Sequence, residues 1–147
     1  MRAYRYVGPE DIRSHMDPES PRARVAREED VLAWIADSSQ IPEPSGYYVA
    51  TFVVDAGGEL WIADRHSEHV ACARNGEVLS AGEISFEVDA GDVNVAEVTN
   101  QSTGYCPEQD SWPAVANALD RVGIPRPSVF RWEFVFRLCP GAGRETS

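Results

Sequence analysis

The chain has 147 residues, of which 43% are hydrophobic and 25% charged, so it is long enough for one domain with its own core. Its 24 acidic residues outnumber 13 arginines, it has no lysine, and its formal net charge is -11 at pH 7. This acidity argues against non-specific binding to phosphate backbones, and no apolar run approaches the length of a membrane helix, so we expect neither nucleic-acid nor membrane partners.

The cysteines Cys72, Cys106 and Cys139 make an odd number. The segment after Met1 carries arginines and has no apolar leader. Both features favour three free thiols in a cytoplasmic protein.

The first part of the chain predicts a short strand over residues 2–7, followed by a helix that begins near Gly8 and Pro9. Residues 18–24 include two prolines and are typical of a loop. A second helix is predicted over residues 27–37, where apolar residues recur at helical spacing. It ends before a segment rich in proline, residues 42–46.

The hydrophobic period then changes to one typical of strands. Two tight turns, at 55–58 and 89–92, and one long polar loop, at 65–76, separate the apolar runs. We expect a four-strand antiparallel meander with strands at 47–54, 59–64, 78–88 and 93–99.

The last helix has clear signals at both ends. Asp110 or Ser111 is expected to cap it, Pro113 lies in its first turn, and Gly123 is its expected left-handed stop. Residues 129–139 then alternate apolar and polar side chains, as a strand does. The sequence therefore predicts an α+β fold, with a mainly antiparallel sheet of about five to six strands and two to three helices. We expect a single domain over 1–139 and a flexible tail over 140–147.

The stretch from 65 to 107 combines strand patterns with many polar side chains at strand ends and in loops. Loops held by a rigid scaffold commonly carry function, so this is where we expect a site. The candidate catalytic residues are His66, Glu83 and Tyr105. The candidate ligand-binding residues are Ser67, His69, Asn100 and Ser102.

Four of these candidates also have a structural interpretation. Glu83 is either a general base held by donors or an ordinary half-exposed strand glutamate. The neighbouring Gly82 indicates a bulge or a close approach by another group. Asn100 and Ser102 either orient a ligand or satisfy turn backbones, and the Tyr105 hydroxyl is either an acid or anchor or belongs to a packed ring.

Metal binding is a further alternative, because His66, His69 and Cys72 lie three residues apart. Imidazole and thiolate are good zinc ligands. This spacing is not a recurrent zinc pattern, however, and no CxxC pair accompanies it. We therefore assign no metal and no cofactor.

The residues HS at 66–67, AGE at 81–83 and NQSTGYCP at 100–107 resemble a pattern found in a domain of bacterial proteins and of plant calmodulin-binding IQ-motif proteins. The chain is also similar to a group of bacterial proteins that begin with YRYVGPEDI and carry NQSTGYCPE. That group continues into a zinc ribbon near Cys139, but here Gly-Ala-Gly follows Pro140, so we expect none. The broader pattern has a histidine before the tyrosine and lacks Thr103. The resemblance implies a site and no particular reaction.

We expect a polar pocket that binds a small-molecule or protein ligand, such as a peptide. One alternative is an enzyme for group transfer or hydrolysis that uses Glu83 or His66 with Tyr105. Arg5 near the start of the chain and Glu83 in a strand suggest one form of such an enzyme, an ADP-ribosyltransferase. Another alternative is an acidic immunity or inhibitor protein that covers a basic partner.

Overall fold

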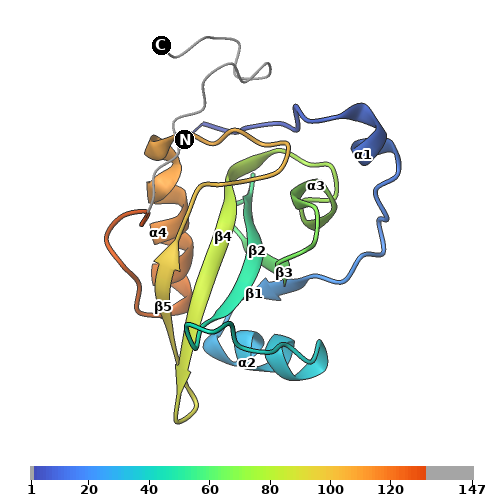
Figure 1. Ribbon diagram of the computed structural model, residues 1–147. Coiled ribbons are helices and arrows are strands. Elements are labelled where there is room, and N and C mark those ends of the chain that lie inside the picture. The colour runs from blue at the N-terminus through green and yellow to red at the C-terminus, as the bar shows by residue number, and fades with distance from the viewer. Residues whose placement is uncertain (1, 132–147) are drawn as a thin grey trace.

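The computed structural model describes residues 2–131, and a five-stranded antiparallel sheet organises them (Figure 1). The central strand β2 (Tyr48–Asp55) pairs with β3 (Leu60–Asp64) on one side and with β4 (Val78–Asp89) on the other. β1 (Ala23–Val25) borders β3, and β5 (Asp92–Val98) borders β4. Together with the helices below, this confirms the predicted α+β class.

Both faces of the sheet are covered, as the continuous apolar run of β2 predicts. Alternate residues of β2 enter different clusters: Phe52 and Val54 join the larger core, whereas Val53 joins a smaller one. The larger core includes side chains from α2 (Glu28–Asp37) and α4 (Trp112–Val122). The N-terminal segment and the short helix α3 (His69–Cys72) contribute to the smaller core.

The helix α4 begins and ends close to the predicted residues. Gly123 has a φ of 88°, so it provides the expected left-handed stop, and Ile124 is buried and donates its N–H to the Leu119 carbonyl at 3.2 Å. Ser111 makes no capping hydrogen bond with its side chain. Its hydroxyl instead lies 2.9 Å from the hydroxyl of Ser80 in the buried interior, so α4 is held to β4 by a polar contact.

Three predictions about the first half of the sheet were wrong. The segment expected as a loop at 18–24 contributes to β1, whose three residues are too few to show a periodic pattern. The strand expected at 2–7 forms only an isolated bridge between Tyr4 and Val78. The strands also do not follow a meander, because β4 pairs with β2 while β1 occupies the outer side of β3.

The long polar loop at 65–76 is likewise more ordered than expected, because it contains α3, all four of whose residues are buried. The remaining helical elements are α1 (Glu10–Ser14) and the 3-10 turn η1 (Gln109–Ser111). α1 matches the helix predicted after Pro9.

The expected last strand lies largely outside the described residues, as do Cys139 and the tail at 140–147. Its first residues are described. Phe130 is buried and packs edge-on against Trp112, with ring centroids 5.0 Å apart. Arg131 donates its N–H to the Val98 carbonyl of β5 at 2.8 Å.

The two described cysteines differ from each other. Cys72 is a free thiol whose burial raises its pKa to about 12. Cys106 is disulfide-bonded, which corrects the expectation of three free thiols and removes one ground for a cytoplasmic location. In the described part of the chain, no helix combines the length and apolar character needed to cross a membrane.

Gly82 of β4 shows the close approach that the sequence indicated. A Cβ atom at this position would lie 1.9 Å from the Thr99 carbonyl oxygen, which is much closer than any real contact. The backbone after β5 therefore packs directly on the backbone of β4.

We predict that Gly82→Ala lowers the free energy of unfolding by about 3 kcal/mol or more, because neither backbone can yield without breaking sheet hydrogen bonds. Urea denaturation measures this change. The matched control is Gly57→Ala, where the nearest atom to the new Cβ would be the Asp55 carboxylate at 3.4 Å. Equal stability of the two variants would contradict the prediction.

Candidate functional site

Three segments of the chain meet around a cavity of about 350 Å³: the turn between β3 and α3, the middle of β4, and the loop after β5. Of the seven candidate residues, His66, Ser67, His69, Glu83 and Ser102 line this cavity. Asn100 and Tyr105 do not. The lining residues are Arg65, His66, Ser67, Glu68, His69, Glu83, Gln101, Ser102 and Thr103.

The turn after β3 is fixed from both sides. The Asp64 carboxylate accepts the N–H of His66 at 2.9 Å, and this hydrogen bond is the main cause of a lowered pKa of Asp64. The hydroxyl of the buried Thr51 lies 3.2 Å from the carbonyl oxygen of Arg65 and 3.4 Å from that of Ser67. The cavity wall made by residues 65–67 is therefore anchored to the central strand.

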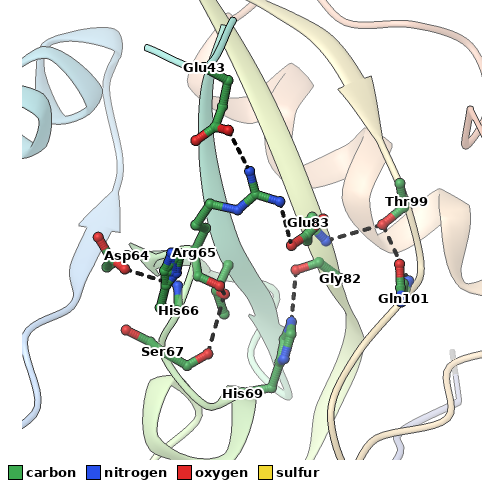
Figure 2. A network of polar contacts seen from close by, with 11 residues as sticks. Glu43, Asp64, Arg65, His66, Ser67, His69, Gly82, Glu83, Thr99 and Gln101 are labelled. Carbon is green, nitrogen blue, oxygen red and sulfur yellow. Dashed lines mark hydrogen bonds and ion pairs between the residues drawn. The ribbon is translucent and has the colours of Figure 1, made fainter. Parts of the chain in front are cut away.

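Arg65 connects two carboxylates from separate elements (Figure 2). Its guanidinium lies 2.9 Å from an oxygen of Glu43, in the connection between α2 and β2, and 3.7 Å from an oxygen of Glu83 on β4. All three side chains are about one-third exposed, so water screens these ion pairs and each contributes little to stability.

Glu83 is held by its backbone. It pairs with Thr51 across β2 and β4, its N–H donates to the Thr99 hydroxyl at 3.3 Å, and its carbonyl accepts the Thr99 N–H at 2.9 Å. Its side chain is 32% exposed at the cavity. Glu83 thus combines the partial exposure of an ordinary strand glutamate with an ion pair.

The ring of His69 is fully engaged. Its Nδ1 accepts the N–H of Thr103 at 3.2 Å, so the proton of the neutral ring lies on Nε2, which donates to the Gly82 carbonyl at 2.8 Å. The side chain is buried, and desolvation lowers its pKa. His69 therefore links α3, β4 and the loop after β5, and it has no free nitrogen for a ligand.

Ser102 differs from the other polar groups of the described chain. Its hydroxyl oxygen is buried and makes no hydrogen bond to any described residue. A buried polar atom without a partner costs free energy, so it commonly marks a place where water or a ligand binds.

Asn100 and Tyr105 have the structural roles that the sequence left open as alternatives. The buried Asn100 donates its amide to the Pro107 carbonyl at 2.9 Å. Tyr105 is fully buried, packs edge-on against Tyr6 and donates its hydroxyl to the Gly76 carbonyl at 2.7 Å. Burial raises the pKa of the Tyr105 hydroxyl above its ordinary value, so this group is a poor general acid.

The cavity-lining residues that were not among the sequence-based candidates are Arg65, Glu68, Gln101 and Thr103, and Glu43 is connected to the cavity through its ion pair with Arg65. Arg65 directly follows a predicted strand, which was a usable signal. Glu43 lies in the proline-rich segment far from the polar stretch, and no local pattern pairs it with Arg65.

The described residues include no group of three or more His, Cys, Asp or Glu side chains placed to hold a metal ion. The spacing of His66, His69 and Cys72 does not produce a common site, because Cys72 is packed in the smaller core.

A second, larger cavity of about 470 Å³ lies between α2 and β1. It is lined partly by the ring of Trp34 and shares Ser67 with the candidate site. We place the candidate function at the smaller cavity, because it is lined by Ser102, whose buried hydroxyl has no hydrogen-bond partner among the described residues.

Comparison with models of protein families, with curated proteins and with solved structures found no match. The family resemblance of the sequence therefore stays a prediction.

We predict that stability depends on pH through His69. The folded protein disfavours protonation of His69, whereas the unfolded residue titrates near 6.5, so its contribution is complete above pH 6.5 and is lost as pH falls toward the lowered folded pKa. Between pH 6.5 and the folded pKa, each unit of decrease in pH should lower the free energy of unfolding of the wild type by up to about 1.4 kcal/mol more than that of His69→Gln. Urea denaturation between pH 5 and 8 measures the slope. His66→Gln is the matched control, and its unfolding free energy should depend on pH as that of the wild type does.

We predict that Tyr105→Phe lowers the free energy of unfolding by about 1–2 kcal/mol, because it leaves the Gly76 carbonyl without its donor. The control is Tyr47→Phe, at a partly exposed ring whose hydroxyl makes no hydrogen bond within the described residues; this variant should change stability by less than about 0.5 kcal/mol. A Tyr105→Phe protein that is as stable as wild type would refute the structural role.

Proposed function

We propose that the cavity bordered by residues 65–69, Glu83 and 101–103 binds a small polar molecule. The observation that carries this proposal is the buried Ser102 hydroxyl, which lacks a partner among the described residues and lies where charged and polar side chains converge. A ligand whose donor or acceptor reaches this hydroxyl would satisfy it, and binding would then recover part of the free energy lost by burying it.

The size and lining of the cavity support a small ligand. A volume of about 350 Å³ is at the lower end of the range for ligand pockets, roughly 300–1,000 Å³. The wall is mainly charged or hydrogen-bonding, so recognition depends on polar contacts more than on apolar burial. The anchored turn and the paired strand hold these groups in place before a ligand binds, which lowers the entropy cost of binding.

An enzymatic role of the same cavity is the alternative that the geometry favours next. His66 and Glu83, two of the three candidate catalytic residues, line the cavity together. Imidazole and carboxylate groups are the usual general acids and bases, which suits hydrolysis or group transfer. Tyr105 lies outside the cavity, so such an enzyme would use His66 and Glu83 without it.

We predict that a small polar ligand raises the melting temperature of the wild-type protein. At a concentration of about 100 times its Kd, a ligand of the folded state adds about 2.7 kcal/mol of stability, a shift of several degrees in a domain of this size. A thermal-shift screen over amines, amino acids, carboxylates, sugars and nucleotides measures it.

Two tryptophan variants locate the binding. Gln101→Trp places a bulky ring at an exposed position on the cavity. It should weaken the apparent affinity for the ligand at least tenfold and so reduce the shift in melting temperature. Gln109→Trp makes the same change at an exposed position in η1, away from the cavity, and should leave the shift unaltered. A ligand whose shift is the same in both variants binds elsewhere and overturns the proposed site.

A further inference from the structure

The Glu83 carboxylate has one ion pair and no hydrogen bond within the described residues. It lies 3.7 Å from the Arg65 guanidinium, which is beyond hydrogen-bonding distance. A carboxylate has two oxygens with about four acceptor sites. Glu83 therefore has unused acceptor capacity at the cavity.

The Arg65 guanidinium lies closer to Glu43 than to Glu83. Its distance to the Glu43 oxygen is 2.9 Å, against 3.7 Å to the Glu83 oxygen (Figure 2). Because the attraction between opposite charges falls with distance, Arg65 compensates Glu43 better than Glu83. This leaves the Glu83 side of the cavity with a negative charge that has an incomplete partner.

The other groups of the cavity favour the same sign of ligand charge. Glu68 adds a second carboxylate to the lining, which contains Arg65 as its one guanidinium among the described residues. The chain as a whole carries a formal charge of -11, so its field attracts cations. The Ser102 hydroxyl both accepts and donates hydrogen bonds, so it is compatible with an N–H donor without selecting the sign of the ligand charge.

We infer that the ligand carries a guanidinium or primary ammonium group, which binds the Glu83 carboxylate in place of the Arg65 guanidinium. The inference rests on the proposed function of the cavity and names the chemical class of its ligand. Arg65 occupies the cation position weakly when the ligand is absent. On binding, it stays paired with Glu43, and the ligand N–H groups bind Glu83 and the Ser102 hydroxyl.

A cation between the Glu43 and Glu83 carboxylates lowers the repulsion between them in both the free protein and the complex. Glu43 and Glu83 both contact Arg65, so without a cation between them they repel. The resident arginine reduces this repulsion in the free protein, and the cationic ligand reduces it further in the complex. Arg65 also competes with the ligand, so its removal should strengthen binding.

The test is a titration of the ¹⁵N-labelled full chain with agmatine, which carries a guanidinium and an amine and no carboxylate. Amide chemical shifts of Glu83, Gln101 and Thr103 report binding at the cavity. We expect saturable shifts in the wild type, at least tenfold weaker binding in Glu83→Gln, and several-fold tighter binding in Arg65→Gln. The matched control is Glu87→Gln, which removes an exposed carboxylate from the same strand, four residues along, outside the cavity. It should bind as the wild type does.

Two further probes separate the outcomes. A Gly-Arg-Gly tripeptide that binds more tightly than agmatine indicates that the cation is an arginine side chain of a peptide; the reverse order indicates a free small cation.

Malonate, a dianion, tests the opposite polarity. If malonate binds and Arg65→Gln abolishes it while agmatine does not bind, the cavity is a ligand site and the inference about its charge is wrong. Agmatine affinity that is unchanged in both Glu83→Gln and Arg65→Gln also overturns the inference. If the cavity amides respond to no compound of the screen at millimolar concentration, both the inference and the proposed function fail.

Discussion

The contact between Gly82 and Thr99 is the constraint on which the candidate site depends. The Thr99 carbonyl occupies the space where any other residue at position 82 would have its Cβ. The backbone that follows β5 can therefore lie against β4, and this brings Ser102 and Thr103 to the cavity. The Gly82 carbonyl is also the acceptor for His69, so β4, α3 and the loop after β5 are connected at one residue.

The same region shows how a polar site is supported on an apolar sheet. The central strand β2 is buried on both faces, and Thr51 is a polar residue within it. The Thr51 hydroxyl contacts two carbonyl oxygens of the turn after β3, and its backbone pairs with Glu83. One buried side chain thus relates the Arg65 turn to the Glu83 strand, and the stability of the sheet fixes the relative positions of the two walls.

The extent to which the sequence predicts this structure differs between elements. The helix that ends at Gly123 was predicted closely, because proline, apolar spacing and glycine are all local signals. The order of the strands was not, because it depends on which edges meet in three dimensions, and the three residues of β1 carry no period of their own. Five of the seven candidate residues chosen from 65–107 line one cavity, and that this cavity is a functional site stays a prediction. Spacing could not separate the cavity-lining Ser102 from the buried Asn100, nor relate Glu43 to Arg65, since those distinctions come from packing over long sequence distances.

The electrostatics of the cavity follow from the absence of lysine and the excess of acids. In such a chain, carboxylates that face each other must share the few guanidinium groups available, and Arg65 is shared between Glu43 and Glu83. The guanidinium lies 2.9 Å from a Glu43 oxygen and 3.7 Å from a Glu83 oxygen, so the ion pair with Glu83 is the weaker of the two. The structure thus combines a rigid backbone around Glu83 with incomplete compensation of its charge. An acceptor on a paired strand that is only partly compensated can bind a donor without rearranging the sheet, and this is the physical basis of the proposed binding function.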